Sequence, residues 1–418
     1  MVVYTMAFFI EKLIEEVRGM RAQRIWLLLL NITFNLVMGF MLPVNTIFIH
    51  KNLHETLVTA GFTLMIYSAF MMVGNAIGGI MFDRFSKRGT LYIGYIISIV
   101  SLLGMSVHHV WPTYAIMLFI LGFGMGLVYT GINAYTAFVA EQMSSNSRVI
   151  FNNMYLASNI GIAVGSNAVG FIFEWSIFFT FFIPMLLFVL SGIILLLRAN
   201  ILDKVHEHAD TNTEVDSNYE TTDMVDPKIK IGSFRFNLNL FIICASIFIV
   251  WLGYSQWDSN LSAYMLDQGY STRQYGFVFT INAGSLLIIQ PVMNRVISKI
   301  FKQLKYQIFI GTVIMGLSFL LLPGAKTYIA FLISMLVLTV GESMVFPTIP
   351  ALLSKMSTNR NRGTFQSFYS IFGSLGRAVG PYAGSLIITA LSFSTLFVGI
   401  TISMIIVAIA MIGVKELV

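Results

Sequence analysis

Three ionisable side chains lie inside long apolar stretches of the sequence. Glu342 is the single charged residue in the run 327–353. Asp258 and Arg377 lie in two further runs, which read WLGYSQWDSNLSAYM and GSLGRAVGPYAG. An ionised group is costly to keep in hydrocarbon, so these side chains should face a wet cavity or one another. Carboxylates in such a place can exchange protons, and we expect Glu342, Asp258 and Arg377 to couple protons to another process.

The depths of these groups leave two interpretations open. Counted from the expected helix starts, Glu342 and Arg377 lie near the middle of a membrane, and Asp258 lies nearer the outer face. In one interpretation Glu342 and Arg377 form a fixed buried pair that orders the second half of the chain. In the other, the pair opens when Glu342 takes up a proton. Substrate and proton would then compete for the carboxylates, which is sufficient for antiport.

Other polar and aromatic residues at similar depth are candidates for a substrate cavity. Aromatic rings can stack on flat ligands or contact cations. The two acids suit a cationic, lipophilic substrate, whereas Arg377 could serve an anionic or zwitterionic one. Taken singly, such residues more often pack or form hydrogen bonds between helices. The candidates are Asn31, Asn35, Tyr129, Asn133, Gln256 and Trp257.

The composition predicts which elements position these groups. Of the 418 residues, 57% are hydrophobic and only 11% are charged, too few to cover the surface of a soluble protein. The chain is therefore predicted to be an all-α, polytopic membrane protein embedded in a lipid bilayer. About twelve apolar runs are long enough to span it: 25–49, 58–82, 89–108, 111–140, 149–173, 175–198, 237–263, 272–297, 305–323, 328–354, 364–390 and 392–413.

Basic residues predict the orientation of these spans. Lys and Arg gather in alternate loops, which places both termini in the cytoplasm of a multi-pass protein of the cell (plasma) membrane. The polar segment after Asn200 reads as a linker between two halves. The predicted parts are an N-terminal cytoplasmic segment (1–24), a six-helix bundle (25–198), a cytoplasmic linker (199–236), a second six-helix bundle (237–413) and a cytoplasmic tail (414–418).

Several classes of function are disfavoured. The single cysteine, Cys244, excludes a Cys-based metal site, and we expect no metal site of any kind. The net charge of +6 fits basic cytoplasmic loops better than nucleic-acid binding. The sequence has no phosphate-binding loop and no HExxH motif, which argues against a membrane enzyme. A proton gradient, with no cofactor, is the expected energy source, and a monomer is sufficient because both halves lie in one chain.

Small residues recur four apart in two corresponding helices. Gly161 and Gly165 lie in GIAVGS, and the second half has the similar GRAVGP, with Gly376, Gly380 and Pro381, followed by Gly384. On a helix these residues share one face and let another backbone approach closely. The repeat supports two homologous halves. The glycine faces are either ordinary packing surfaces or a pivot in a conformational cycle.

The loop after the second predicted helix resembles a family motif. It reads GIMFDRFSKRG, which resembles the Gly-x-x-x-Asp-Arg-x-Gly-Arg-Arg/Lys signature of the major facilitator superfamily. Ser86 replaces the usual second glycine. Asp83 could pair with a basic residue and face a helix N-terminus of the other half, latching the cytoplasmic side. The matching residues are Gly79, Asp83, Arg84, Lys87 and Arg88.

Within that superfamily, the seventh and tenth predicted helices look most like drug/proton antiporters of the lactococcal multidrug type. Such exporters carry an acid in each of these helices, which the resemblance transfers to Asp258 and Glu342. The glycine-proline motif, however, lies in the eleventh helix instead of the fifth, and the fourth lacks a basic residue. We therefore expect alternating access and proton-coupled export of lipophilic small molecules. Transport of a specific nutrient or flipping of a lipid-linked substrate are the alternatives.

Overall fold

A computed structural model describes residues 22–141, 147–202, 234–325, 327–356 and 362–415. Most of the predicted linker, nearly all of the N-terminal segment and three residues of the tail lie outside the described residues. Within the described part every regular element is a helix.

The first half of the chain forms one group of helices. The long apolar runs become helices because a chain in hydrocarbon must satisfy its backbone hydrogen bonds within each segment. In order they are α2 (Ala22–Ile47) with the π-helical turn η1 (Phe48–Asn52), α3 (Leu57–Arg84), α4 (Lys87–Val107), α5 (Thr113–Glu141), α6 (Ser147–Trp175) and α7 (Ile177–Leu202).

The second half repeats this arrangement. Its elements are α8 (Phe234–Asp258), α9 (Asn260–Asp267), α10 (Thr272–Ile300), α11 (Leu304–Phe319), α12 (Tyr328–Met356), α13 (Arg362–Ala390) and α14 (Phe393–Ile412). With η1 continuing α2 and α9 continuing α8, these helices correspond to the twelve predicted spans. Ten are long and apolar enough to cross a membrane within the described residues, and α11 is a shorter apolar helix. The prediction of an all-α membrane fold is confirmed.

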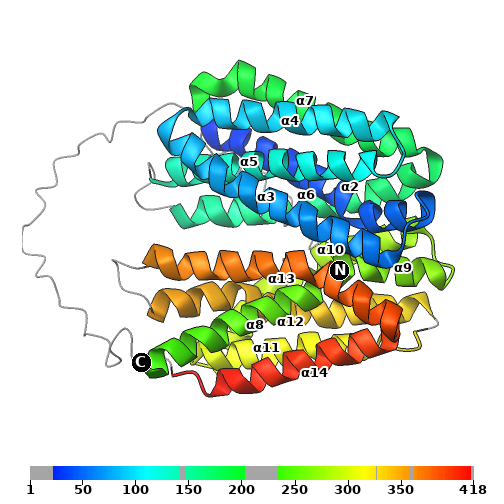
Figure 1. Ribbon diagram of the computed structural model, residues 1–418. Coiled ribbons are helices and arrows are strands. Elements are labelled where there is room, and N and C mark those ends of the chain that lie inside the picture. Colours follow the sequence, from blue (N-terminus) through cyan, green and yellow to red (C-terminus); the bar gives the residue numbers. More distant parts are fainter. Residues whose placement is uncertain (1–21, 142–146, 203–233, 326, 357–361, 416–418) are drawn as a thin grey trace, which may run out of the picture.

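Each half has its own hydrophobic core. The first core includes the buried rings of Phe34, Tyr95 and Phe188, and the second includes Trp257 and Phe319. In Figure 1 the helices run side by side, with the first half above and the second half below. We call the end where α7 finishes and α8 begins the linker end, and the opposite end the far end.

Contacts between the two halves run along α6 with α10 and along α3 with α13. Both contacts are close because glycines face them. A Cβ on Gly61 of α3 would lie 2.9 Å from the Cα of Tyr382 in α13, and one on Gly170 of α6 would lie 2.8 Å from the Cα of Arg273. Among the residues that the structure describes, two ion pairs join the halves at the far end: Lys51 with Asp267 (2.6 Å) and Arg273 with Glu174 (3.7 Å). The structure is therefore closed at its far end.

Candidate functional site

The seventh span breaks at an acidic residue. Helix α8 ends at Asp258, Ser259 leaves the helical region with φ −134° and ψ −87°, and α9 begins at Asn260. Discontinuous helices are a recurrent way to place polar groups inside a transporter, because the break frees backbone groups and admits a charge. Asp258 is partly buried at this point, so its carboxylate lies within the helix bundle.

Glu342 lies near the middle of α12 and is almost fully buried, with 6% of its surface exposed. Its Oε2 accepts a hydrogen bond of 2.9 Å from the side-chain amide of Asn282 on α10. The same amide donates to Oγ1 of Thr339 at 2.8 Å. A buried carboxylate thus has one defined donor, and the donor comes from a neighbouring helix.

Arg377 on α13 does not form the expected pair with Glu342. Its guanidinium carbon lies 3.8 Å from the ring centroid of Trp251 on α8, a cation–π arrangement. Asp258 is close enough to interact electrostatically with both Arg377 and Glu342. The aromatic ring offers the guanidinium an alternative partner, and the Asn282 amide supplies Glu342 with its hydrogen bond. The two charges therefore find separate partners, with Asp258 interacting with both.

An aromatic cluster surrounds these charges. Trp251 stacks on Phe346 of α12 with 4.4 Å between ring centroids, and Tyr254 packs edge-on against both rings. Trp251 fits closely on α13 because a glycine lies beneath it: a Cβ at Gly373 would be 2.9 Å from the indole ring. Two carboxylates, one guanidinium and three rings thus lie together among α8, α12 and α13. We call this group the central cluster; it comprises Trp251, Tyr254, Asp258, Glu342, Phe346 and Arg377.

The first half contributes two tyrosines to this central cluster. Tyr155 of α6 lies close enough to Glu342 to interact electrostatically, and Tyr129 of α5 lies similarly close to Tyr369, which precedes Arg377 on α13. Both tyrosines lie well inside their helices yet are 44% and 45% exposed. The cluster therefore lies between the halves, where a molecule would meet groups from both.

Sequence reasoning missed several members of this cluster, although helical spacing points to them. Residues four or seven apart share a helix face. Trp251 and Tyr254 lie seven and four positions before Asp258, and Phe346 lies four after Glu342. Asn282 lies on a separate helix that carries no nearby charge, so only the fold shows its role.

Four of the six predicted cavity residues lie in helix packing instead. Asn31 and Asn35 are buried between α2 and α6, where they donate to the carbonyl of Met154 and the hydroxyl of Ser158. Gln256 donates to the carbonyl of Gly380 at 2.8 Å. Trp257 is fully buried in the second core. Interhelical hydrogen bonds and core packing explain these four, whereas Tyr129 and Asn133 are exposed on one face of α5.

The glycine faces form two equivalent helix pairs. Gly161 and Gly165 lie against α2, and Gly376, Gly380 and Gly384 lie against α8. Pro381 is inside α13, and its carbonyl accepts a hydrogen bond of 3.1 Å from Asn260. The pairs α2–α6 and α8–α13 thus occupy matching places in the two halves, as the repeat in the sequence indicates.

The loop motif lies at the linker end of α3 and α4. Lys87 lies 3.4 Å above the ring centroid of Phe138, and Arg88 donates to Oδ1 of Asn200 at 3.1 Å. Gly79 lies on the α3 face next to Thr130, and Arg84 is exposed. The side chain of Asp83 lies outside the described residues, so its latch stays a prediction.

A family model, the Major Facilitator Superfamily, matches residues 27–354 and 259–416. The chain belongs to the major facilitator superfamily. Members of this superfamily are secondary transporters, and the chain is therefore a transporter and not an enzyme. It is 30% identical over 350 residues to YttB, an uncharacterized MFS-type transporter of Bacillus subtilis, with 84% of each chain covered. Multidrug resistance protein 1 of the same bacterium is 22% identical, covering 84% of this chain and 85% of its own.

Solved structures with this fold include peptide-transporter relatives. A POT family transporter in complex with 5-aminolevulinic acid has a TM-score of 0.79 at 15% identity, covering 94% of this chain and 96% of its own. A peptide transporter POT in complex with sulfate has a TM-score of 0.77 at 13% identity, covering 95% and 94%. At such identities the likeness shows the major facilitator fold, with its two six-helix bundles, and not the substrate.

Proposed function

We propose that this major facilitator protein exports lipophilic small molecules in exchange for protons, with Glu342 and Asp258 as the groups that bind the proton. The observation that carries the proposal is the buried carboxylate of Glu342, which accepts a hydrogen bond from Asn282 and lies close enough to Asp258 to interact electrostatically. An ionised carboxylate that is shielded from water has a high free energy. Neutralisation by a proton or by a cationic substrate lowers that free energy.

The coupling follows from competition for the same carboxylates. A proton on Glu342 removes the negative charge that a cationic substrate would contact. Binding of either ligand therefore disfavours binding of the other, which is the thermodynamic requirement for antiport. Asp258, at the break between α8 and α9, would pass the proton between the bundle interior and one membrane face.

The surroundings of the carboxylates suit a lipophilic ligand. Trp251, Tyr254 and Phe346 offer ring faces beside the acids, and Tyr129 and Tyr155 approach from the first half. Flat apolar groups gain from such contacts, and cations gain from the ring faces. The similarity to Multidrug resistance protein 1 of Bacillus subtilis supports this substrate class.

The conformation of the chain supports alternating access. The halves touch through α6–α10 and α3–α13, and their ion pairs lie at the far end. The distribution of Lys and Arg favours a cytoplasmic linker end. In that orientation this conformation is closed toward the outside of a plasma membrane. The far-end contacts would then have to separate for a substrate to leave the cell, and a single chain carries both moving halves.

A second candidate is proton-coupled transport of a zwitterionic nutrient. Arg377 lies close enough to Asp258 to interact electrostatically, so the cluster presents both signs of charge. Such a pair can bind a carboxylate and an ammonium group of one ligand. The solved structures with the same fold include a POT family transporter in complex with 5-aminolevulinic acid, which supports this candidate.

Transport in proteoliposomes with an imposed pH gradient tests the proposal. A lipophilic fluorescent cation and the lumenal pH are followed together for the wild type, Glu342→Gln and Glu55→Gln. Glu55 is a matched acid in the loop between η1 and α3, away from the cluster. We expect uphill dye movement with opposite proton flow, lost in Glu342→Gln and kept in Glu55→Gln. If the wild type moves a zwitterionic amino compound and never the dye, export of lipophilic compounds is refuted and the second candidate stands.

A further inference from the structure

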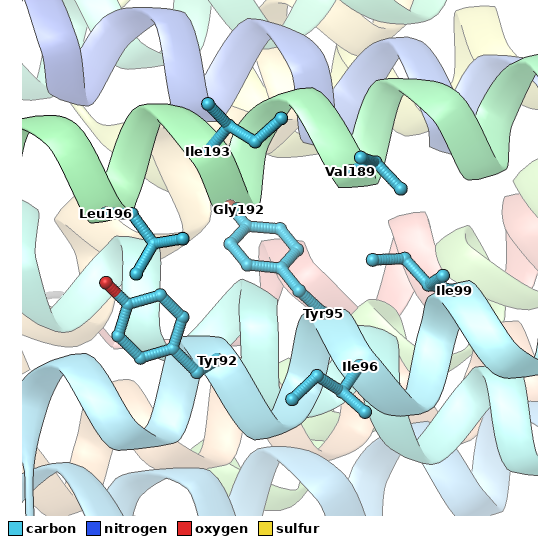
Figure 2. A pocket seen from close by; sticks show the side chains of 8 residues that line it. All are labelled: Tyr92, Tyr95, Ile96, Ile99, Val189, Gly192, Ile193 and Leu196. Carbon is cyan, nitrogen blue, oxygen red and sulfur yellow. The ribbon is translucent and has the colours of Figure 1, made fainter.

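The apolar groove between α4 and α7 lies apart from the two buried acids. In Figure 2 the side chains of the two helices face one another across it, among them Tyr95, Ile99 and Val189. Its eight lining residues include no carboxylate, lysine, arginine or histidine. Both helices belong to the first half. The groove is therefore separate from the chemistry of Asp258 and Glu342, which lie in the second half.

The break in the seventh span leaves backbone carbonyls of α8 without helical partners. The last four C=O groups of a helix have no donor within it, and α8 ends at Asp258, so the carbonyl of Trp257 is one of them. The hydroxyl of Tyr275 on α10 donates to this carbonyl. Trp257 and Tyr275 are both fully buried, so the hydroxyl supplies the hydrogen bond that water would supply at an exposed helix end. Tyr275 therefore caps α8 next to Asp258.

Tyr275 also lies near the carboxylate that follows this carbonyl. It is close enough to Asp258 to interact electrostatically. Its ring packs edge-on against Phe279, one turn later on α10, with 5.4 Å between the centroids, which fixes the direction of the hydroxyl. Without the cap, the partial negative charge of the Trp257 carbonyl oxygen would lie unpaired beside a carboxylate. The hydroxyl should therefore favour the ionised form of Asp258.

The same helix also holds the second acid. Asn282, whose side-chain amide donates to Glu342, lies seven residues after Tyr275. Residues seven apart share a helix face. One face of α10 thus reaches both acid-bearing spans, with Tyr275 at the end of α8 and Asn282 at the middle of α12.

A different face of α10 forms the contact between the halves. A Cβ at Gly276, the residue after Tyr275, would lie 3.1 Å from the carbonyl carbon of Ser166 on α6. One turn later Thr280 accepts a hydrogen bond of 3.2 Å from Asn167. A movement of α10 relative to α8 and α12, such as separation of the halves would cause, therefore acts on both hydrogen bonds at once.

We propose that Tyr275 is a positioning residue for Asp258, as Asn282 is for Glu342, so that α10 ties both carboxylates to the contact between the halves. The inference rests on the proposed function of the two acids as proton-binding groups. It adds a residue that touches no proton or substrate and acts through the backbone that carries Asp258.

Asp258 also faces three other titratable or charged groups. Arg377 on α13, Glu342 on α12 and Tyr254 on α8 all lie close enough to interact with it electrostatically. These groups act on the carboxylate through space. Tyr275 differs from them because its hydroxyl is bonded to the peptide group that precedes Asp258, so removal of this one hydroxyl tests the proposal.

Reaction of the full-length protein with dicyclohexylcarbodiimide is the test, because the reagent adds to a carboxyl group in its protonated form. Labelling of Asp258 and Glu342 is followed against pH by peptide mass spectrometry in the wild type, Tyr275→Phe and Tyr264→Phe. Tyr264 is a matched control, since it is buried in the same core and its hydroxyl also donates to a backbone carbonyl, that of Leu322 at 3.2 Å. In Tyr275→Phe the half-labelling pH of Asp258 should rise by about half a unit to one unit, the effect of one hydrogen bond.

Each outcome decides the proposal. A rise at Asp258 in Tyr275→Phe, with a smaller change at Glu342 and none in Tyr264→Phe, supports it. An unchanged profile in Tyr275→Phe, an equal rise in both variants, or an Asp258 that never reacts overturns it. Size-exclusion profiles of the three proteins, expected to be the same, exclude misfolding. The proposed function is tested separately: a wild type whose Asp258 shows the expected profile but which never exchanges dye for protons refutes antiport and leaves the positioning role standing.

Discussion

The side-chain amide of Asn282 on α10 donates a hydrogen bond of 2.9 Å to the carboxylate of Glu342 on α12. Helix α10 also packs against α6 of the first half. The carboxylate proposed to bind the proton is thus tied to a helix that forms the contact between the halves. A change in the charge of Glu342 would alter this hydrogen bond, and the change would reach α10 directly.

Replacing Asn282 by Leu should therefore uncouple transport from the proton gradient. A hydrogen bond to a charged group contributes about 1.5–3 kcal/mol, so proton-driven uptake of dye should fall at least about tenfold. Thr339→Val is the matched control, because it removes the other acceptor of the Asn282 amide and leaves the bond to Glu342. Proteoliposome transport with and without a pH gradient measures the effect. If Asn282→Leu and Thr339→Val couple equally well, the hydrogen bond to Glu342 has no part in coupling.

The contact between Arg377 and Trp251 should govern ligand affinity. Trp251→Leu removes the ring face and frees the guanidinium to turn to Asp258, where it would compete with a cationic ligand. Because Arg377 is exposed, its cation–π contact is worth about 0.5–1 kcal/mol, so the Kd of a lipophilic cation should rise about two- to fivefold. Trp251→Phe keeps a ring and should lose less. Equilibrium dye binding gives the Kd, with the exposed Trp175→Leu as control. Equal affinity in the two leucine variants would contradict the assignment.

Helices and charges in this chain could be predicted from the sequence, whereas the partners of the charges could not. Apolar runs of membrane length must become helices, and the single charge in 327–353 marked Glu342 as unusual. Arg377 was expected beside Glu342 because depth along a helix is readable from residue number. The rotation of a helix about its axis and the identity of its neighbours are set by tertiary packing. That packing places the guanidinium of Arg377 over the ring of Trp251.

The break in the seventh span is a second feature that the sequence does not reveal. No proline or glycine lies between Asp258 and Asn260, so the usual signals of a helix end are missing. The interruption at Ser259 is accompanied by contacts of α9 with α2, α10 and α13. Similarly, Asn31 and Asn35 have the polarity of cavity residues. They pack between helices instead, because α6 presents the carbonyl of Met154 and the hydroxyl of Ser158 as acceptors for their side-chain amides.

The far-end ion pairs should favour the conformation seen here. Lys51→Glu places an acid beside Asp267, and the repulsion should open the far end. The double variant Lys51→Glu/Asp267→Lys forms the ion pair with its charges exchanged and should restore the closed far end. An exposed pair contributes up to about 1 kcal/mol, which predicts a shift of about fivefold in the ratio of the two conformations. Opening is measured with Thr280→Cys in a Cys244→Ser background, from its rate of labelling by an impermeant maleimide. Thr280 lies at the interface of the halves, where it accepts a hydrogen bond from Asn167, so separation of the halves should speed labelling. Labelling that is equally fast in the single and double variants would show that the pair does not hold this end closed.

Packing of α13 on α8 should be intolerant of a methyl group at Gly376. A Cβ there would lie 3.0 Å from the backbone nitrogen of Leu252 and nearer still to the carbonyl oxygen of Phe248, neither of which can turn aside as a side chain does. Overpacking of this kind costs about 1–3 kcal/mol. Gly376→Ala should therefore unfold at a lower temperature than the wild type.

The chain contains its own reporter for this measurement. Cys244 is the only cysteine, it is buried with 4% exposure, and it lies on α8 one turn before Phe248. A thiol-reactive dye should label Cys244 at a lower temperature in Gly376→Ala. In Gly399→Ala the added Cβ meets open space. Cys244 should then be labelled at the wild-type temperature or slightly above it, since alanine favours the helix by about 1 kcal/mol. If both variants shift to the same lower temperature, Gly376 does not provide the close approach of α8 to α13, and the interpretation of this glycine face as a pivot loses its basis.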